Sequence, residues 1–328
     1  METKRILIIG TGSIGERHLR CFQKRGAIVA ACEPNFQLGE RIASQYNCPW
    51  FSGLDGALAE SFDAAIICTP AHTHVPIAFK CLKSNLGLLI EKPLSTSTQG
   101  LDDLAKESEA AGAVVRVGYV YRSFLVMLKA RELLATGLLG DIKHVAVESG
   151  QHFPTFRPAY RTIYYSRHEN GGGAIQDAMT HFLHVIEWLI SPIRSVFCDA
   201  AHQVLEGVDV EDTVNISARL ENKALASFSL NQFQAPNETV LSIHGIKGSL
   251  RIELHRSRVG IYLSGGNWEW HELEKEDRDG PFLRQADSFL EALAGRPDGL
   301  SSLAEGTQTL RVNIAALTSS RERREIQL

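Results

Sequence analysis

The sequence predicts two domains: an N-terminal α/β domain with a parallel sheet over residues 1–120, and a C-terminal α+β domain over residues 121–328. The first 120 residues alternate short apolar runs with helical patterns, which is typical of a parallel sheet covered on both faces. After residue 121 the pattern changes to strand-like segments separated by turns and flanked by helices, which is typical of an antiparallel meander. A length of 328 residues also suits two domains.

The elements of the first half follow directly from this alternation. Five apolar runs are predicted as strands, at Arg5–Ile9, Ile28–Cys32, Ala64–Cys68, Leu86–Ile90 and Val114–Val117. Helical patterns lie between these runs, at Ile14–Lys24, Gln37–Tyr46, Val75–Lys83 and Thr98–Ala111. The runs are nearly unbroken in their apolar character, so we expect the strands to be buried on both faces.

The second half is predicted to combine four helices with a sheet. Helical patterns cover Arg122–Ala135, Ala174–Ile190, Phe282–Ala294 and Ser302–Ser320. Strands are predicted at Ile142–Glu148, Thr213–Leu220, Ala224–Asn231, Glu238–His244, Ser249–Leu254 and Arg258–Leu263. The segment Gln151–Gly173 is irregular, rich in aromatic residues, and ends in three glycines.

The composition is that of a soluble globular protein, with 44% hydrophobic and 22% charged residues. Lys and Arg number 34 and Asp and Glu 38, and this net charge of −4 gives no strong attraction to nucleic acid or to an anionic membrane. No apolar run approaches the roughly 18–20 residues of a membrane span, and the N-terminus lacks the pattern of a secretory signal. The six cysteines form no C-x-x-C pair. We therefore expect a cytoplasmic protein with reduced thiols and no zinc site.

A glycine-rich motif follows the first predicted strand. Gly10, Gly12 and Gly15 match G-x-G-x-x-G, with Ser13 and Ile14 between the last two. The first glycine permits a tight turn, the second lets the backbone approach a pyrophosphate, and the third allows the helix to pack closely on the strand. The motif opens a helix, whose N-terminus favours an anion. The alternative is a glycine-rich turn without a ligand, but the surrounding pattern predicts a dinucleotide site.

The acidic residue that ends the second strand bears on the choice of cofactor. Glu33 lies where a carboxylate would hold the ribose 2′-hydroxyl, and it would repel a 2′-phosphate. Pro34 and Asn35 follow it, so no arginine is at hand to accept that phosphate. We therefore predict NAD, with NADP less favoured; the alternative is that Glu33 is a surface residue that points elsewhere.

Two further motifs carry candidate catalytic residues. Lys92 belongs to Glu91-Lys92-Pro93, which comes directly after an apolar strand, and strand ends of an open α/β sheet lie at the ligand crevice. The alternative is an ordinary surface lysine. Asp177, His181 and His184 fall on one side of a predicted helix, opposite its apolar face. This side could also be a solvated helix face. A metal site is a third possibility, but no ligand cluster completes it. We expect no metal.

The chain resembles the glucose–fructose oxidoreductase/inositol dehydrogenase (Gfo/Idh/MocA) family. The motifs that carry this resemblance span the chain, in the order G-x-G-x-x-G, Thr69-Pro70…His74, Glu91-Lys92-Pro93, Gly171-Gly172-Gly173…Asp177…His181 and Gly245-Ile246-Lys247-Gly248-Ser249. The sequence departs from the family at Ala71, where many relatives have Asn, and at His184 and Glu187, where an Asp often follows the histidine.

The resemblance implies a fold, a set of site residues and an assembly. The fold is an N-terminal Rossmann domain followed by an α+β domain on an open, mostly antiparallel sheet, which often forms the oligomer interface; a homodimer or homotetramer is expected. Lys92, Asp177 and His181 match the family's catalytic lysine, acid and histidine. The cofactor-binding residues expected are Gly10, Gly12, Ser13, Ile14, Gly15, Glu33, Thr69, Pro70, His74, Glu91 and Lys92.

The aromatic segment is a candidate for the substrate site. Rings offer flat apolar faces and arginines offer forks for carboxylate or phosphate; the alternative is a packed connector under the sheet. Its pattern is similar to family members encoded with nonulosonic-acid and surface-polysaccharide genes, which favours an anionic or nucleotide-linked sugar. The substrate-binding residues expected are Arg122, Arg157, Tyr160, Arg161 and His184.

The predicted function is NAD-dependent hydride transfer between nicotinamide and a secondary alcohol or ketone of a sugar, sugar acid, nucleotide-sugar or cyclitol. A histidine near neutral pKa suits the proton transfer, and a lysine ammonium stabilises developing alkoxide charge. Two alternatives remain open. One is a non-catalytic NAD- or sugar-binding sensor or regulatory protein, and the other is an enzyme with a non-sugar substrate such as a bile pigment or dihydrodiol.

Overall fold

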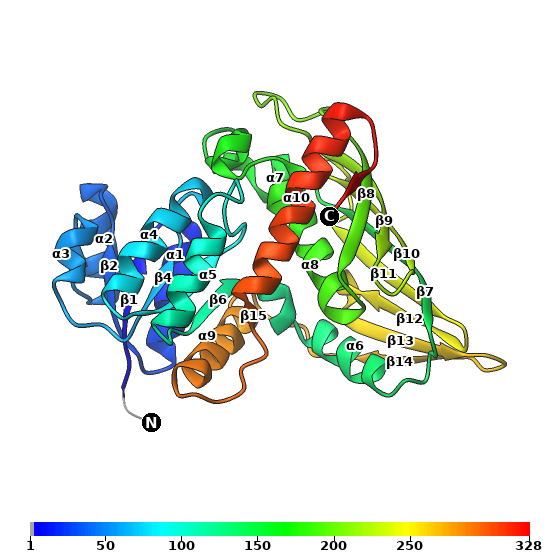
Figure 1. Ribbon diagram of the computed structural model, residues 1–328, viewed down its shortest axis with the longest axis horizontal. Coiled ribbons are helices and arrows are strands. Elements are labelled where there is room, and N and C mark those ends of the chain that lie inside the picture. The colour runs from blue at the N-terminus through cyan, green and yellow to red at the C-terminus, as the bar shows by residue number, and fades with distance from the viewer. Residues whose placement is uncertain (1–2) are drawn as a thin grey trace. The chain divides into compact units, whose positions relative to one another are not determined.

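The computed structural model describes residues 3–328, which form two compact units (Figure 1). The first unit extends to Ser123 and also includes Glu276–Thr307; the second comprises Phe124–Lys275 and Gln308–Leu328. The boundary predicted after residue 120 assigned everything that follows to the second domain. The structure differs because a later segment returns to the first unit.

The returning segment completes the first unit by packing on its first helix. Helix α9 (Gly280–Leu293) contacts α1 (Ser13–Lys24). Phe22 and Phe289 meet edge to face with ring centroids 6.1 Å apart, and Arg20 binds the Asp279 carboxylate through two nitrogens. Buried aromatic contacts of this kind cannot be read from local periodicity, which explains why the sequence assigned the helix to the other domain.

The first unit contains a seven-stranded sheet in the order β15-β6-β5-β4-β1-β2-β3, parallel except for β15. Because β4 and β5 are buried along their whole length, the sheet is covered on both faces, as predicted. The strands are β1 (Arg5–Ile9), β2 (Ile28–Cys32), β3 (Trp50–Phe51), β4 (Ala64–Ile67), β5 (Gly87–Glu91), β6 (Val115–Gly118) and β15 (Ser301–Ser302).

The helices of this unit begin and end close to their predicted bounds. Besides α1 and α9 they are α2 (Phe36–Tyr46), α3 (Leu54–Leu58), α4 (His74–Lys83) and α5 (Leu101–Ala110), with 3₁₀ turns η1 (Ala71–Thr73) and η2 (Val120–Ser123). The short β3 and α3 carry too few residues to show a period, and the sequence analysis did not predict them.

The second unit contains a nine-stranded sheet in the order β14-β13-β12-β11-β7-β10-β9-β8-β16. The predicted meander is interrupted, since β7 lies between β10 and β11 and runs parallel to β10; the other pairs are antiparallel. The strands are β7 (Ile142–Gly150), β8 (Ile193–Ala201), β9 (Thr213–Leu220), β10 (Leu225–Asn231), β11 (Glu238–Gly245), β12 (Gly248–Glu253), β13 (Arg258–Leu263), β14 (Trp268–Glu272) and β16 (Ile326–Gln327).

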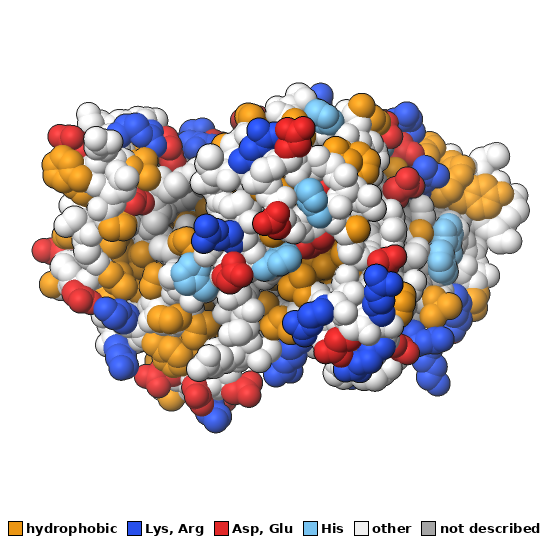
Figure 2. All heavy atoms as spheres, turned by 90° about the horizontal axis from the view of Figure 1, so that it is seen from above, with side chains coloured by type: hydrophobic (Ala, Val, Ile, Leu, Met, Phe, Trp, Pro, Cys, Tyr) orange, Lys and Arg blue, Asp and Glu red, His pale blue; other side chains and the backbone are white. Residues whose placement is uncertain are grey.

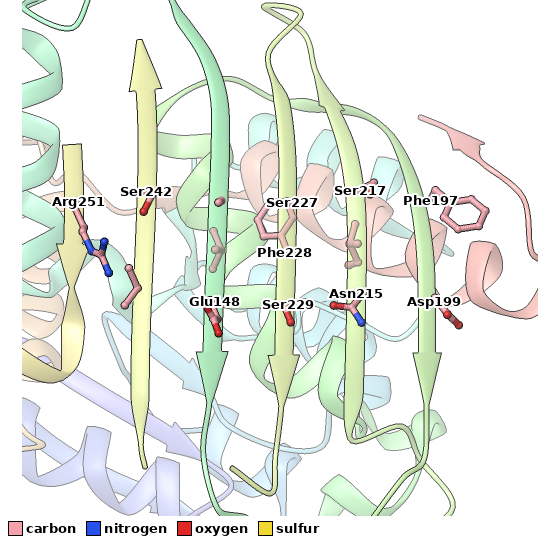
Figure 3. A pocket seen from close by; sticks show the side chains of 14 residues that line it. Glu148, Phe197, Asp199, Asn215, Ser217, Ser227, Phe228, Ser229, Ser242 and Arg251 are labelled. Carbon is pink, nitrogen blue, oxygen red and sulfur yellow. The ribbon is translucent and has the colours of Figure 1, made fainter. Parts of the chain in front are cut away.

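One face of this sheet is buried and the other is open. Burial alternates residue by residue along β9 and β10, as expected for a sheet with one covered face. Helices lie behind the sheet in Figure 3, on the face opposite the exposed side chains Glu148 and Ser229. These helices include α6 (Leu125–Ala135) and α8 (Thr180–Leu189); α10 (Leu303–Glu322) follows near the end of the chain.

The helix that carries the candidate acid and histidine is not uniform. A π-helical turn, η6 (Ile175–Met179), precedes α8, where the sequence predicted one continuous α-helix. A π turn accommodates an extra residue, so the angle between Asp177 and His181 around the axis differs from that of an α-helix. Such turns are frequent at functional sites, and a 3.6-residue pattern cannot reveal them.

Candidate active site

The glycine motif forms the turn between β1 and α1, and its three glycines have three different surroundings. Gly10 has φ +81°, which favours glycine. A Cβ on Gly15 would lie 1.9 Å from the Gly10 carbonyl oxygen, so this glycine permits the close approach of helix and strand. A Cβ on Gly12 would meet no atom within 4 Å. The space above Gly12, at the N-terminus of α1, therefore suits an approaching pyrophosphate.

Glu33 lies beside this turn, at the end of β2. Its carboxylate accepts hydrogen bonds from the Thr11 amide at 2.9 Å and hydroxyl at 3.2 Å, and from the Asn35 amide at 3.0 Å. It is buried rather than directed away from the protein. The Glu33 side chain is therefore not an outward-pointing surface group. Each carboxylate oxygen has two lone pairs, so Glu33 retains acceptor capacity for ribose hydroxyls.

The ends of β4 and β5 supply the remaining candidates of the first unit. Thr69 follows β4, and its methyl group lies 3.0 Å from the position of a Cβ on Gly10. Pro70 is exposed, and Lys92, which follows β5, is half-buried. Because β1 stands next to β4 and β4 next to β5, these residues share the carboxyl edge of the sheet, where ligands of such sheets bind.

Two of the predicted cofactor ligands lie behind this edge instead. Glu91 and His74 are buried, at 5% and 1% exposure. Glu91 contacts His18 and the Lys92 amide, and the His74 ring contacts the carbonyl oxygens of Thr69 and Pro93. Both side chains are thus occupied in holding the strand ends. Burial also lowers the pKa of His74, which favours its neutral form.

In the second unit the candidate acid has two partners from the aromatic segment. The Tyr164 hydroxyl donates to Asp177 Oδ1 at 2.5 Å, and an Arg157 guanidinium nitrogen lies 3.7 Å from Asp177 Oδ2. Asp177 is buried, whereas Arg157 is half exposed and rests on the Phe153 ring. A carboxylate that accepts a hydrogen bond from a hydroxyl and lies near a cation is held in a fixed orientation.

His181 is half-buried in the first turn of α8, one turn beyond Asp177 in the chain. Lys92 belongs to the first unit, and Asp177 and His181 to the second. The structure brings Asp177, Tyr164 and Arg157 together within the second unit.

The entry to the π turn is held by Glu211, which the sequence analysis missed. The Glu211 carboxylate accepts a hydrogen bond from the Ile175 amide at 2.8 Å and pairs with His168 at 2.5 Å. The Glu211 carbonyl oxygen accepts a hydrogen bond from the Ala174 amide. A Cβ on Gly173 would lie 2.6 Å from this carboxylate, so only glycine fits there. The pair raises the pKa of His168. Glu211 lies in the loop before β9, and no local signal marks it. Tyr164 could have been found by its place in the aromatic segment.

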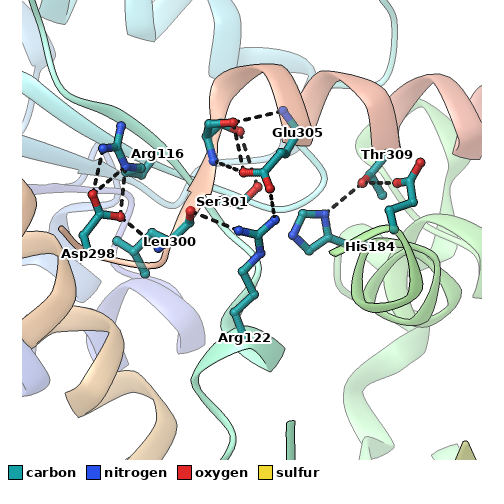
Figure 4. A network of polar contacts seen from close by, with 10 residues as sticks. Arg116, Arg122, His184, Asp298, Leu300, Ser301, Glu305 and Thr309 are labelled. Atoms are coloured by element: carbon teal, nitrogen blue, oxygen red, sulfur yellow. Dashed lines mark hydrogen bonds and ion pairs between the residues drawn. The ribbon is translucent and has the colours of Figure 1, made fainter. Parts of the chain in front are cut away.

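Two predicted substrate ligands are buried and hydrogen-bonded to other side chains or backbone (Figure 4). The buried Arg122 guanidinium donates to the Leu300 carbonyl at 3.1 Å and pairs with Glu305 at 2.5 Å. His184 is buried as well, with Nδ1 2.9 Å from the Thr309 hydroxyl. On the predicted helix face, Asp177 and His184 are buried and His181 is half-buried, so this face is not a fully solvated one.

Two more predicted ligands lie in or on a small core. Tyr160 is buried with Phe153, Tyr165, Leu205, Val208 and Val210. Its hydroxyl donates to the Glu206 carbonyl, and Arg161 lies over its ring and pairs with the Glu206 carboxylate. The segment is thus partly the packed connector that the sequence analysis weighed. Among the predicted arginines, Arg157 is the one beside the candidate acid.

The residues described contain no group of three or more His, Cys, Asp or Glu side chains that could hold a metal ion. All six cysteines are free. No helix within residues 3–328 is long and apolar enough to cross a membrane. On the face drawn in Figure 2, acidic and basic side chains are interspersed.

A hollow of about 580 Å³ lies elsewhere, on the open face of the nine-stranded sheet (Figure 3). Its walls are mostly small or polar, and include Glu148, Asp199, Asn215, Ser229 and Arg251. None of the predicted catalytic, cofactor or substrate residues lines it. It is therefore not the candidate active site.

Two family models match the chain. Residues 4–119 match the oxidoreductase family with an NAD-binding Rossmann fold, and residues 127–251 match the GFO/IDH/MocA C-terminal domain. Together they account for most of the chain, with a match in each unit.

Curated relatives and solved structures agree with this assignment. The chain is 24% identical to 2,7-anhydro-N-acetylneuraminate hydratase of Escherichia coli, over 83% of this chain and 74% of the relative. It is 23% identical to inositol 2-dehydrogenase of Rhizobium meliloti, over 99% of both chains. The WlbA dehydrogenase of Bordetella pertussis, solved with NADH and UDP-GlcNAcA, shares its fold with a TM-score of 0.85 at 22% identity, covering 99% of this chain and 98% of that one.

The glycine turn with open space at Gly12, the buried acidic residue at the end of β2 and the matches in both units lead to one assignment. The chain belongs to the GFO/IDH/MocA family of oxidoreductases, and its first unit is an NAD-binding Rossmann domain.

Proposed function

We propose that this protein is an NAD-dependent dehydrogenase or reductase that acts on a secondary alcohol or ketone of an anionic sugar, either a sugar acid or a nucleotide-linked sugar. The observation that carries the proposal is the cluster of Asp177, Tyr164 and Arg157, which puts a partly exposed cation beside the candidate catalytic acid. The relatives named above support the substrate class, since one is named for a sialic-acid derivative and another was solved with UDP-GlcNAcA.

The residues that would hold the cofactor are the glycine turn and Glu33. Amides at the N-terminus of α1 suit the pyrophosphate, and the Glu33 carboxylate suits the ribose hydroxyls while repelling a 2′-phosphate. Bound nicotinamide supplies the hydride acceptor at C4, or the donor in the reverse direction.

Side chains of the protein transfer the proton of the substrate hydroxyl. In the oxidation, His181 takes the proton from the substrate hydroxyl as the carbon that carries this hydroxyl loses a hydride and becomes a ketone. The Lys92 ammonium stabilises the alkoxide charge that develops on the oxygen. Asp177, held by Tyr164, orients the histidine or a neighbouring substrate hydroxyl. In the reduction the same groups act in reverse.

Arg157 is the residue proposed to select the charge of the substrate. A guanidinium binds a carboxylate or phosphate through two parallel hydrogen bonds, and an ammonium cannot reproduce this geometry. We expect Arg157→Lys to raise KM for an acidic sugar by about tenfold or more, with little change for a neutral analogue. Arg161→Lys is the matched control, because Arg161 is already paired with Glu206.

A substrate screen tests the proposal. Nicotinamide absorbance is followed with uronic acids, UDP-linked sugar acids, 2,7-anhydro-N-acetylneuraminate, neutral sugars and cyclitols, and NAD binding is measured by calorimetry. Turnover of an acidic sugar with NAD supports the proposal. Turnover restricted to neutral sugars or inositols would refute an anionic substrate. NAD binding without turnover of any compound would favour the alternative of a non-catalytic sensor or regulatory protein.

We further infer that two copies associate through the open face of the nine-stranded sheet, as the family resemblance implies. Exposed Phe197 and Leu225 lie on this face, with small side chains such as Ser227 between the charged ones. Light scattering of the purified protein tests this inference. We expect Ser227→Arg to reduce the measured mass to that of a monomer, and a monomeric wild-type protein would contradict it.

A further inference from the structure

We propose that His18 and His74 are positioning residues for Lys92, and that they do so by holding the residues on either side of it, Glu91 and Pro93. The inference rests on the proposed catalytic role of Lys92. All of these residues lie in the first unit. The two histidines come from different helices, α1 and α4, which both begin beside the carboxyl edge of the sheet.

The first contact fixes the residue before Lys92. His18 Nε2 lies 2.7 Å from Glu91 Oε1, and the Lys92 amide donates to Glu91 Oε2 at 3.0 Å. A carboxylate only accepts hydrogen bonds, so His18 must carry a proton on Nε2. His18 is fully buried between the Phe22 and Phe282 rings, with Phe282 in an edge-on contact at 5.3 Å. The ring therefore has little freedom to move.

The Glu91 carboxylate occupies space left by the missing side chain of Gly118. A Cβ on Gly118 of the neighbouring strand β6 would lie 2.9 Å from Glu91 Oε1. Any larger residue at this position would push the carboxylate away from His18. A buried carboxylate is costly unless its oxygens receive hydrogen bonds. The contacts with His18 and with the Lys92 amide meet this need, so they hold the backbone at Lys92 firmly.

The second contact fixes the residue after Lys92. His74 Nδ1 lies 3.1 Å from the Pro93 carbonyl oxygen, and its Nε2 lies 2.7 Å from the Thr69 carbonyl oxygen. A neutral imidazole carries one N–H, so the ring donates a hydrogen bond to one of these carbonyl oxygens and packs against the other. The ring is thus in contact with both the turn after β5 and the turn after β4. Thr69 is also the residue that lies against Gly10 of the glycine turn. Lys92 is therefore tied through His74 to the same edge that the cofactor site occupies.

Such fixation matters because catalysis depends on the position of the charge. A displacement of about 1 Å at a catalytic group can cost roughly 100-fold in rate. A lysine side chain is long and flexible, so the position of its ammonium depends on a backbone that does not move. Buried histidines supply directional hydrogen bonds for this purpose, and a leucine of similar volume would fill the same space without them.

The first experiment measures Lys92 itself and needs no substrate. The purified protein with NAD is treated with a trace of acetic anhydride, and mass spectrometry gives acetylation of Lys92 relative to the exposed Lys106. We expect His18→Leu to change this acetylation ratio by about threefold or more, because Glu91 loses its contact with His18 and the turn at Lys92 becomes free to move. His18→Gln, whose amide can reproduce the Nε2 donor, should restore it.

A matched control separates positioning from general destabilisation. Asp298→Asn weakens another, partly buried polar pair of the same unit, with Arg116 on β6. It should lower thermal stability and leave the Lys92 ratio unchanged. A His18→Leu protein that is folded and labels like the wild type would overturn the proposal. If His18→Leu does not fold, His74→Leu takes its place under the same criterion.

The second experiment is a double-mutant cycle on turnover of the acidic sugar found in the screen. If His18 acts through Lys92, His18→Leu lowers kcat in the wild type by about tenfold or more, with KM for NAD changed less than about threefold, and has little further effect in Lys92→Ala. Additive losses would refute the positioning role. A Lys92→Ala enzyme with normal turnover would instead refute the proposed function. The labelling experiment would still show whether His18 fixes the position of Lys92.

Discussion

The glycine turn allows a prediction in which two neighbouring substitutions have opposite consequences. Gly12→Ala adds a methyl group into open space, and Gly15→Ala adds one 1.9 Å from the Gly10 carbonyl oxygen. Gly12 has φ −59°, a value that alanine adopts without strain. We therefore expect Gly12→Ala to fold normally and to bind NAD poorly, and Gly15→Ala to lose stability.

The magnitudes follow from these contacts. A carbon and an oxygen ordinarily approach to about 3.3 Å, so α1 and β1 must separate by about 1.4 Å in Gly15→Ala. Overpacking costs typically 1–3 kcal/mol or somewhat more, and replacing glycine in a helix returns up to about 1 kcal/mol. A net loss of about 2 kcal/mol corresponds to a fall of roughly 4–8 °C in the melting temperature. In Gly12→Ala, loss of one or two charge-assisted hydrogen bonds weakens NAD binding by at least about tenfold.

Calorimetry measures both effects in one set of samples. The melting temperature is recorded without NAD, and the dissociation constant for NAD is measured at a temperature where every variant is folded. Gly26→Ala is not a suitable control because its φ is +80°, whereas Gly56 sits in open space in α3, far along the chain from the cofactor motif. Gly56→Ala should leave NAD binding unchanged and should raise the melting temperature slightly or not at all, since alanine favours the helix. A Gly12→Ala protein that binds NAD like the wild type, or a Gly15→Ala protein that melts like it, would refute the reasoning.

The other predictions concern catalysis, cofactor choice and pH. Lys92→Ala and His181→Ala should each lower turnover by roughly 100-fold with NAD binding retained, and near-normal turnover would exclude that residue's role. Kinetics with both cofactors should show that Glu33→Ala narrows the preference for NAD by about tenfold or more; a wild-type preference for NADP would contradict the assignment. His168 has a raised pKa through its bond to Glu211, so its contribution to stability is present below about pH 6.5 and is lost as the pH rises through the folded pKa. His168→Gln should therefore lower the melting temperature at pH 6 more than at pH 9, and an equal loss at both would exclude the ion pair.

The sequence by itself determined the N-terminal domain and its cofactor. The strands Arg5–Ile9 and Ile28–Cys32 have the bounds predicted for them, because strands buried on both faces need continuous apolar runs. The glycine spacing is also a local requirement, since the turn, the approach of a ligand and the helix packing all involve residues within six positions. The candidates Lys92, Asp177 and His181 could be named from motifs, although their roles remain predictions.

Only the tertiary structure decided which side chains are used in packing. Tyr160, Arg122 and His184 looked available for substrate by residue type, but their partners lie 46, 183 and 125 positions away in the chain. The return of α9 to the first unit, the insertion of β7 beside β10 and the support of the π turn by Glu211 also depend on distant segments. Local periodicity reports which side of an element is apolar, whereas the element that covers that side is fixed by long-range packing and by the pairing of buried polar groups.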